Sequence, residues 1–287
     1  MRRGILAAAF VYLLWGLLPI YWKALAAVPS QELMAHRVVW SWPIAFLLLL
    51  AQGQAPRLGQ IARRPAAWFP FIASAALLSI NWLTYLWANN NGHIVETSLG
   101  YFMNPLVNVL LGMVFLRERL RPGQWIAVAL ACAGVSYLTL SYGQPPWISL
   151  TLAFSFGLYA LIRKTAALGS IEGLTLELGV MFVPAAAFLL HRALIGAGAF
   201  GRLGVRTDLM LIVGGVLTCI PLVLFAFGAR RVPLTTMGLL QYTSPTLQFL
   251  IGVFMFGEPF TPARLIGFGF IWAALAIYTY HSWRRSG

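Results

Sequence analysis

Acidic residues are the scarcest feature of this 287-residue sequence. Only seven Asp and Glu stand against 20 Lys and Arg, and charged residues make up 9% of the chain. The sequence holds no H-E-x-x-H, G-x-S-x-G or P-loop motif, and no pair of acids at metal-site spacing. These absences argue against an enzyme, a bound metal and a cofactor, because each needs a recognisable cluster of such groups.

Cysteine is also rare, with two residues in the chain. Cys132 and Cys219 both lie inside apolar runs, and neither belongs to a C-x-x-C motif or a metal-ligand pattern. We interpret them as small buried hydrophobes, which leaves the redox compartment undecided. Long polar stretches are missing as well, so a soluble domain does not fit beside the apolar runs.

Apolar residues dominate what is present. Hydrophobic residues account for 60% of the chain and the mean hydropathy is +0.80, more than a soluble fold can bury. A helix that crosses the hydrocarbon core needs roughly 20 apolar residues. The apolar runs therefore predict an all-α integral membrane protein with ten transmembrane helices. We expect these helices near residues 4–24, 32–51, 67–89, 94–116, 123–142, 147–163, 171–191, 208–229, 235–256 and 263–282.

The basic residues fall between the apolar runs. On alternate sides of ten spans, fourteen Arg and Lys gather on one side and five on the other, while Arg37 lies inside a span. Positive residues favour the cytoplasmic side of a membrane, so we predict a multi-pass protein with both termini cytoplasmic. We expect the basic residues to set this orientation in the membrane. We expect membrane lipid, and not nucleic acid, as a partner. The larger group comprises Arg2, Arg3, Arg57, Arg63, Arg64, Arg117, Arg119, Arg121, Arg163, Lys164, Arg230, Arg231, Arg284 and Arg285.

A motif recurs in the second half of the sequence at a constant offset. Tyr-Phe-Met-Asn-Pro at 101–105 corresponds to Gln-Tyr-Thr-Ser-Pro at 241–245, which lies 140 residues later. Glu118 and Glu258 match at the same offset. Both glutamates end equivalent spans, where we expect them to make loop hydrogen bonds.

The number of spans determines how the two copies are oriented. With five spans in each half, an odd number, the second copy enters the membrane upside down relative to the first. Inverted repeats of this kind are characteristic of secondary transporters. We therefore predict two inverted five-helix repeats, residues 1–143 and 144–287, around a central cavity.

Polar side chains inside the spans indicate where the interior of the bundle lies, because a polar group in hydrocarbon normally faces other helices or water. Asn104 and Ser244 each lie about ten residues inside their spans, near the midplane where inverted-repeat transporters bind substrate. These depths predict a substrate-binding set, although hydrogen bonds between helices are an alternative role for the amides. The set comprises His36, Arg37, Asn81, Trp82, Tyr85, Tyr101, Asn104, Asn108, Gln241, Tyr242, Ser244 and Gln248.

Pro105 and Pro245 directly follow the two midplane residues. Each proline removes a backbone donor and frees the carbonyl four residues earlier, at Tyr101 and Gln241. The freed carbonyls could bind a ligand, or the helices could bend there as hinges. The alternative is a harmless kink, satisfied by neighbouring Asn or Ser side chains.

Arg37 lies about one turn inside the second span, where an unpaired charge is costly. It needs an anionic partner, so we weigh an ion pair with Glu96, at a similar depth, against contact with a substrate or snorkelling to the interface. His36, Glu96 and Glu177 are the groups that could couple transport to protons. A hydrogen-bonded structural role is the stronger interpretation for His36.

Several of these segments resemble a known family. SLGYFMNPLVN at 98–108 is the most specific, and HRVVWS at 36–41, NW at 81–82 and WANN at 87–90 add to it. In these segments the chain resembles the RarD-type branch of the EamA group in the drug/metabolite transporter superfamily. The resemblance spans nearly the whole chain and implies ten helices in two inverted repeats, a central cavity, and export of metabolites or drug-like solutes without ATP. It implies no agreed set of binding residues.

Residues and resemblance together predict a secondary transporter, an exporter of small organic metabolites or drug-like solutes across the bacterial inner membrane by alternating access. We expect a small-molecule substrate and no obligatory protein partner. The alternative is a non-transporting membrane sensor or assembly factor, which short loops disfavour because they leave almost no soluble surface. Substrate identity, direction, and the choice between proton coupling and facilitated diffusion stay open.

Overall fold

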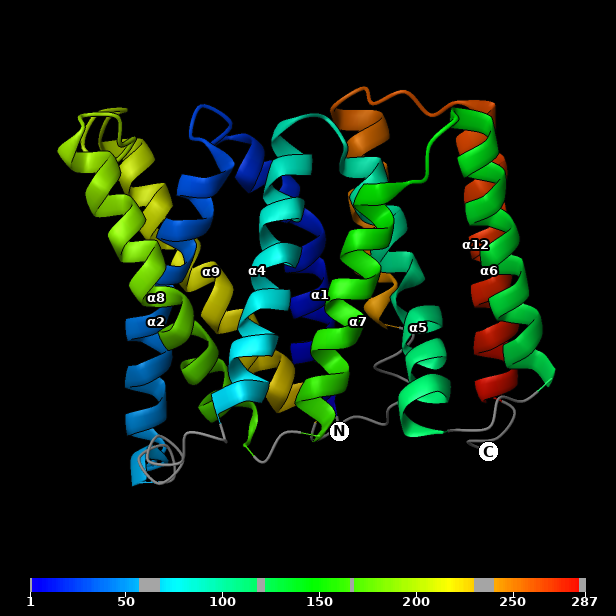
Figure 1. Ribbon diagram of the computed structural model, residues 1–287, viewed down its shortest axis with the longest axis horizontal. Coiled ribbons are helices and arrows are strands. Elements are labelled where there is room, and N and C mark those ends of the chain that lie inside the picture. The colour runs from blue at the N-terminus through cyan, green and yellow to red at the C-terminus, as the bar shows by residue number, and fades with distance from the viewer. Residues whose placement is uncertain (1, 57–67, 118–121, 166–167, 230–239, 284–287) are drawn as a thin grey trace.

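The computed structural model describes residues 2–56, 68–117, 122–165, 168–229 and 240–283, and all regular elements in these ranges are helices (Figure 1). Hydrocarbon offers no hydrogen-bond partner, so a chain of this hydropathy satisfies its backbone within helices. The elements are α1 (Arg2–Lys23), α2 (Ser30–Ala51), α4 (Trp68–Asn90), α5 (Ile94–Leu116), α6 (Pro122–Tyr142), α7 (Trp147–Thr165), α8 (Ser170–Leu194), α9 (Val205–Ala229), α11 (Thr243–Leu250), the π-helical turn η2 (Ile251–Met255) and α12 (Pro262–Trp283).

These helices confirm the predicted order of ten helical segments. Most boundaries agree within two or three residues, and η2 continues α11 directly to form the ninth segment. The first part of that predicted span, residues 235–239, lies outside the described residues. Among the described residues, six helices are long and apolar enough to cross a membrane, namely α1, α2, α4, α5, α8 and α12, while α6, α7 and α11 with η2 contain shorter apolar stretches.

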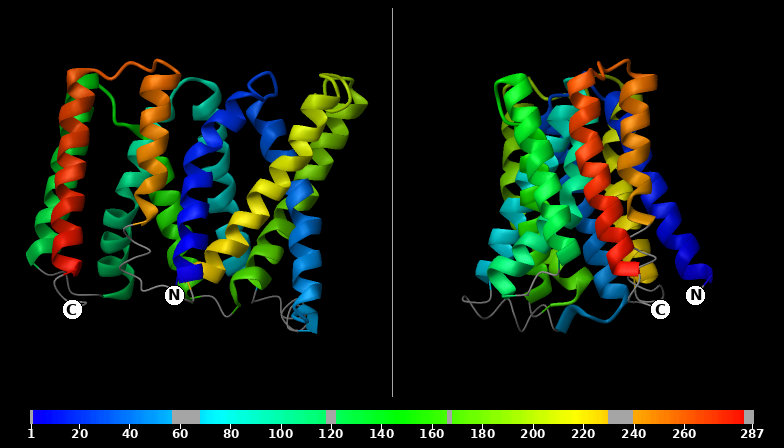
Figure 2. Two further views of the ribbon diagram at one scale, coloured as in Figure 1. Left: turned by 180° about the vertical axis from the view of Figure 1, so that it is seen from behind. Right: turned by 90° about the vertical axis from the view of Figure 1, so that its right-hand side faces the viewer.

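The helices stand side by side in a bundle that is elongated in one direction (Figure 1). α6 packs against α12 at one side, and α2 packs with α8 and α9 at the other. α1 begins and α12 ends at the same end of the bundle, which we call the terminal end (Figure 2). α2 and α5 begin at the opposite end, which we call the far end.

The outer surface of the bundle is apolar on several helices. Phe69 on α4, Leu140 on α6, Val183 on α8 and Phe254 on η2 are each more than two-thirds exposed. Soluble proteins rarely present so many large apolar side chains, whereas a bundle in a bilayer has hydrocarbon to cover them. The surface therefore agrees with the hydropathy in indicating a membrane protein.

The close crossing of α5 and α7 depends on Gly100. A Cβ atom at this position would lie 2.9 Å from the carbonyl oxygen of Ser149 and 3.0 Å from Cβ of Leu152. Small residues at such crossings let helix backbones approach each other, which is how helices pack in a membrane. Any larger residue would push α7 away from α5.

We expect Gly100→Ala to lower the melting temperature of the purified protein in detergent, because overpacking costs about 1–3 kcal/mol. Gly269→Ala is the matched control, since a Cβ atom there has no neighbour within 4 Å. The control should melt as the unaltered protein does or slightly higher, because alanine favours helix more than glycine. Equal melting temperatures for the two variants would contradict the close crossing.

Candidate functional site

Arg37 projects from α2 and contacts residues of three other helices. Its Nε donates to Oγ1 of Thr218 on α9 at 2.8 Å. Its Cζ lies 4.0 Å from the ring centroid of Trp82 on α4 and 5.4 Å from that of Trp22 on α1. Oγ1 of Thr218 donates in turn to the carbonyl of Gly214. One hydroxyl and two aromatic faces, which attract cations, therefore hold the guanidinium.

Of the three roles weighed for Arg37, the ion pair with Glu96 is wrong. Glu96 instead accepts a hydrogen bond from Nη2 of Arg264 at 2.9 Å and lies 3.1 Å from Nδ1 of His93. No described carboxylate lies within 4.0 Å of a nitrogen of Arg37. Similar depth does not bring the two residues together, because α2 packs on α4, α8 and α9, whereas the start of α5 faces the segment before α12.

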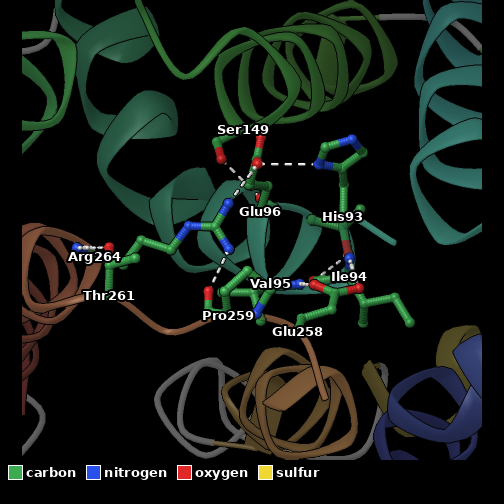
Figure 3. A network of polar contacts seen from close by, with 10 residues as sticks. His93, Ile94, Val95, Glu96, Ser149, Glu258, Pro259, Thr261 and Arg264 are labelled. Carbon is green, nitrogen blue, oxygen red and sulfur yellow. Dashed lines mark hydrogen bonds and ion pairs between the residues drawn. The ribbon is translucent and has the colours of Figure 1, made fainter. Parts of the chain in front are cut away.

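Figure 3 shows residues from the second half of the sequence in contact with the N-terminal end of α5. The carboxylate of Glu258 accepts hydrogen bonds from the backbone nitrogens of Ile94 at 2.7 Å and Val95 at 2.8 Å. It satisfies two N–H groups that the helix leaves free and lies at the positive end of the helix dipole. Glu258 thus caps a distant helix, which goes beyond the loop hydrogen bonds expected of it, while Glu118 lies outside the described residues.

Two tyrosines of the predicted set lie near Arg37. Tyr85 on α4 and Tyr101 on α5 have ring centroids 5.8 Å apart, and both are close enough to interact electrostatically with the guanidinium. Asn104 follows Tyr101 by about one turn of α5. The hydroxyl of Tyr85 and Oδ1 of Asn104 are buried and have no hydrogen-bond partner in the described structure. The structure thus places Arg37, Trp82, Tyr85 and Tyr101 together, with unsatisfied polar atoms on α4 and α5.

Asn81 and Gln248 connect helices, and Ser244 is a partner of Gln248 on the same helix. Nδ2 of Asn81 on α4 donates to a backbone carbonyl of α7 at 3.0 Å and to Oγ of Ser155 at 3.1 Å. Nε2 of Gln248 on α11 donates to Oγ of Ser244 at 3.2 Å and to the carbonyl of Trp15 on α1 at 3.3 Å. Asn81 and Gln248 therefore make the interhelical hydrogen bonds that were the alternative to substrate contact.

Three further members of the set share no hydrogen bond or ring contact with Arg37. Asn108 is exposed on α5, whereas Gln241 and Tyr242 are half-buried just before α11. The ring of Tyr242 stacks with Phe102 of α5 at a centroid distance of 6.4 Å. Their role in substrate binding stays a prediction.

His36 is buried next to Arg37 in the sequence but faces a different neighbour. Its ring stacks on Phe200 with the centroids 5.3 Å apart, and Nδ1 has no hydrogen-bond partner in the described structure. Stacking, and not a hydrogen bond at Nδ1, holds this ring. The segment before α9 thereby covers α2 near the far end.

Glu177 on α8 is fully buried, and both carboxylate oxygens have partners. Oε1 accepts from Oγ of Ser74 at 2.6 Å and lies 3.6 Å from Nε of Arg163, while Oε2 accepts from the hydroxyl of Tyr159 at 3.2 Å. None of these partners was predicted from the sequence. The available signal was the spacing of Tyr159 and Arg163, which are four residues apart on one face of α7.

Within the described residues, no cluster of three or more His, Cys, Asp or Glu could hold a metal ion.

The two repeated prolines lie in different local structures. Pro105 is inside α5, which continues through it. Pro245 is the third residue of α11, which begins after a turn at Tyr242. In the first turn of a helix, proline lacks only a donor that would have no partner there. The turn at Tyr242 therefore accommodates Pro245, and the hinge role of both prolines stays a prediction.

Comparison with known proteins adds a family context to these contacts. A profile of the EamA-like transporter family matches residues 2–140. Protein RarD of Streptomyces exfoliatus is 44% identical over 285 residues, which cover 99% of this chain and 90% of the relative. The uncharacterized transporter YojE of Bacillus subtilis is 42% identical and covers 99% and 97% of the two chains. The chloramphenicol-sensitive protein RarD of Pseudomonas aeruginosa is 34% identical, with coverage of 98% and 95%.

A solved crystal structure is also similar to this chain. Its TM-score is 0.62 at 22% sequence identity, and the match covers 99% of both chains. At this identity the likeness concerns the fold alone. The helical arrangement in Figure 1 therefore occurs in a known crystal structure along its whole length.

We expect Glu177→Ala to destabilise the protein strongly, because breaking one side of a buried ion pair costs about 3–5 kcal/mol. The variant leaves Arg163 without its counter-charge, so the melting temperature in detergent should fall clearly. The double variant with Arg163→Ala should recover part of the loss. Asp208→Ala, which removes an exposed hydrogen bond to Gly201, is a control with little expected effect. Strictly additive losses in the double variant would contradict the coupling of Glu177 and Arg163.

Proposed function

This chain belongs to the EamA-like transporter family, and on that premise we propose that it is a secondary carrier that exports small organic metabolites or drug-like solutes across the bacterial inner membrane by alternating access. Relatives named as transporters share about two-fifths of its residues along nearly the whole chain. They carry transporter names and not enzyme names, which fits a sequence without a catalytic motif.

The observation that carries the proposal is the pattern of helix contacts. This pattern stays the same when each helix of one half is replaced by the helix of the same rank in the other half. α1 packs on α9 and α11 as α7 packs on α4 and α5, and α2 packs on α9 as α8 packs on α4. The pairs α2 with α8, α5 with α11, and α6 with α12 join helices of the same rank in their halves. We infer that residues 1–143 and 144–287 are two inverted five-helix repeats. The family profile ends at residue 140, close to this boundary.

Two glycines lie at helix crossings that correspond to each other when the two halves are exchanged. A Cβ atom at Gly16 on α1 would lie 2.8 Å from Leu247 on α11, and one at Gly157 on α7 would lie 2.8 Å from Val107 on α5. Leu247 and Val107 each follow the proline of the repeated motif by two residues. Matching crossings support halves that can exchange conformations around a central cavity, which is the basis of alternating access.

The contacts of the two candidate carboxylates favour substrate-driven facilitated diffusion over proton coupling through Glu96 or Glu177. Three partners enclose Glu177, and Glu96 contacts Arg264 and His93, so protein groups already occupy both carboxylates. The binding region that we propose is the group around Arg37. The Pseudomonas relative is named for chloramphenicol sensitivity, which supports including drug-like solutes in the substrate range.

The charge distribution supports cytoplasmic termini. Fourteen Arg and Lys belong to the side on which the chain begins, against five on the other side. α1 begins and α12 ends at one end of the bundle, as an even number of spans requires (Figure 2). We therefore propose that the terminal end faces the cytoplasm and the far end faces the periplasm or exterior.

Proteoliposomes that contain the full chain should exchange at least one small organic solute by saturable counterflow without ATP. The panel comprises radiolabelled amino acids, aromatic acids and amphenicols, with empty liposomes as the background. Asn104→Ala should reduce the flux several-fold, because it removes a buried polar group near the midplane. Asn91→Ala, an exposed asparagine between α4 and α5, should leave the flux unchanged.

Each part of the proposal has an outcome that would contradict it. Absence of flux for every solute in the panel would favour the membrane sensor or assembly factor. Equal flux through the Asn104 and Asn91 variants would remove Asn104 from the binding region. Faster loss of a preloaded solute from cells that overproduce the chain would identify export, whereas faster uptake would contradict it.

We expect a membrane-impermeant maleimide to label Gln144→Cys in intact cells and Gln52→Cys only after permeabilisation. Both residues are exposed. Gln144 belongs to the loop between α6 and α7, which lies at the far end, and Gln52 directly follows α2, which ends at the terminal end (Figure 1). Cys132 and Cys219 are replaced by alanine in both variants, since Cys132 is exposed. The reverse labelling pattern would place the termini outside the cytoplasm.

A further inference from the structure

Arg37 is a buried cation without a counter-charge among the described residues. It is 8% exposed, and its one hydrogen bond there runs from Nε to Thr218. The rings of Trp82 and Trp22 attract the charge, but a ring face is no substitute for a carboxylate. A charge that leaves water needs an ionic partner, and burial without one is strongly destabilising.

The buried acids of the described chain show that partners are otherwise supplied by the protein. Glu32 binds an arginine at 2.7 Å, Glu172 and Glu258 accept hydrogen bonds from backbone nitrogens, and Glu177 has three side-chain partners. Glu177 lies 140 residues after Arg37, so the two occupy matching positions of the repeated sequence. One charge is neutralised within the protein, and the other is left for a group that the described chain does not contain.

The free edge of Arg37 has a defined geometry. Nε is engaged by Thr218 and one face of the guanidinium lies over Trp82, so the terminal Nη groups are the donors that remain. Neither Nη group donates a hydrogen bond to a described residue. A carboxylate in the plane of the guanidinium would accept two parallel hydrogen bonds from this edge. A neutral carbonyl could accept from the edge but could not neutralise the charge.

The residues around Arg37 restrict the chemistry of the ligand beyond its carboxylate. Tyr85 and Tyr101 lie within electrostatic reach of the guanidinium, and the buried hydroxyl of Tyr85 has no hydrogen-bond partner in the described structure. This hydroxyl is a donor for a carboxylate oxygen that still has a free lone pair. Trp82, Tyr85 and Tyr101 otherwise present aromatic surface, which suits an apolar or aromatic body. A second anionic group would have no cation to bind among these neighbours.

We propose that Arg37 binds the carboxylate of the transported substrate, and that the substrate class is monocarboxylates with an apolar or aromatic body that lies against Trp82, Tyr85 and Tyr101. The proposal rests on the proposed transport function, because the bound acid is a substrate only if the chain is a carrier. The carboxylate supplies the missing counter-charge, and its departure leaves the guanidinium unpaired. Dicarboxylates are disfavoured, because their second charge would be buried without a partner.

The test compares acids with their own amides on the purified full-length protein in detergent. The probes are phenylacetate, 3-phenylpropanoate and indole-3-acetate, each beside its neutral amide, together with succinate as a dicarboxylate. Binding is measured by the rise in melting temperature and by quenching of tryptophan fluorescence, since two tryptophans flank Arg37. At least one monocarboxylate should bind about tenfold more tightly than its amide, because only the acid neutralises the guanidinium and accepts charge-assisted hydrogen bonds from it.

Two variants of Arg37 and one control variant test whether Arg37 causes the preference for acid over amide. Arg37→Gln should lose the preference for acid over amide, and Arg37→Lys should keep part of it, because lysine retains the charge without the planar fork. Arg202→Gln, an exposed arginine between α8 and α9, should leave the preference intact. If Arg37→Gln does not fold, Arg37→Lys and the acid–amide comparison on the unaltered protein still decide the matter.

The outcomes separate this proposal from the transport function. If the unaltered protein prefers no acid over its amide, or if Arg37→Gln retains the preference, the carboxylate site is overturned even when proteoliposomes transport neutral solutes. If the acid preference depends on Arg37 but no solute is transported, the anion site stands and the carrier function fails. Succinate binding as tight as that of the best monocarboxylate would overturn the restriction to a single charge.

Discussion

The structure depends on the absence of hydrogen-bond partners in hydrocarbon. Every backbone group in the bilayer must be satisfied within the protein, which makes the chain a series of helices, and every buried charge must be neutralised or hydrogen-bonded. The acids follow this requirement closely. Glu258 caps α5 across the boundary between the halves, and Glu177 joins α4, α7 and α8 through Ser74, Tyr159 and Arg163.

Some exceptions to this requirement lie where function is expected. Arg37 has no described anion, and polar atoms of Tyr85 and Asn104 are buried without partners. They come from α2, α4 and α5, and each would be destabilising in a purely structural bundle. Buried ionisable groups inside membranes are rare and functional for this reason. A carrier can tolerate such groups, because its ligand satisfies them during each cycle.

The two halves also differ in an informative way. If they are inverted copies, Arg37 and Glu177 occupy matching places with opposite charges, and within the described part of the chain only Glu177 has a counter-charge. A helix pair locked by an internal ion pair in one half and left open to a ligand in the other would make the halves unequal in stiffness. Under the proposed carrier function, such asymmetry would give two similar halves one site for the solute.

The sequence alone determined the class of fold, the order and approximate bounds of the helical segments, and the family, because hydropathy, span length and motifs are local properties of the chain. It also identified Arg37 and Glu177 as buried charges. Only the tertiary structure decided their partners. Arg37 meets Thr218, Glu96 meets Arg264 and not Arg37, and Glu177 meets Ser74. Residues at one depth in different helices can lie on opposite sides of a bundle, and helix crossings, which the sequence does not reveal by itself, decide which of them touch.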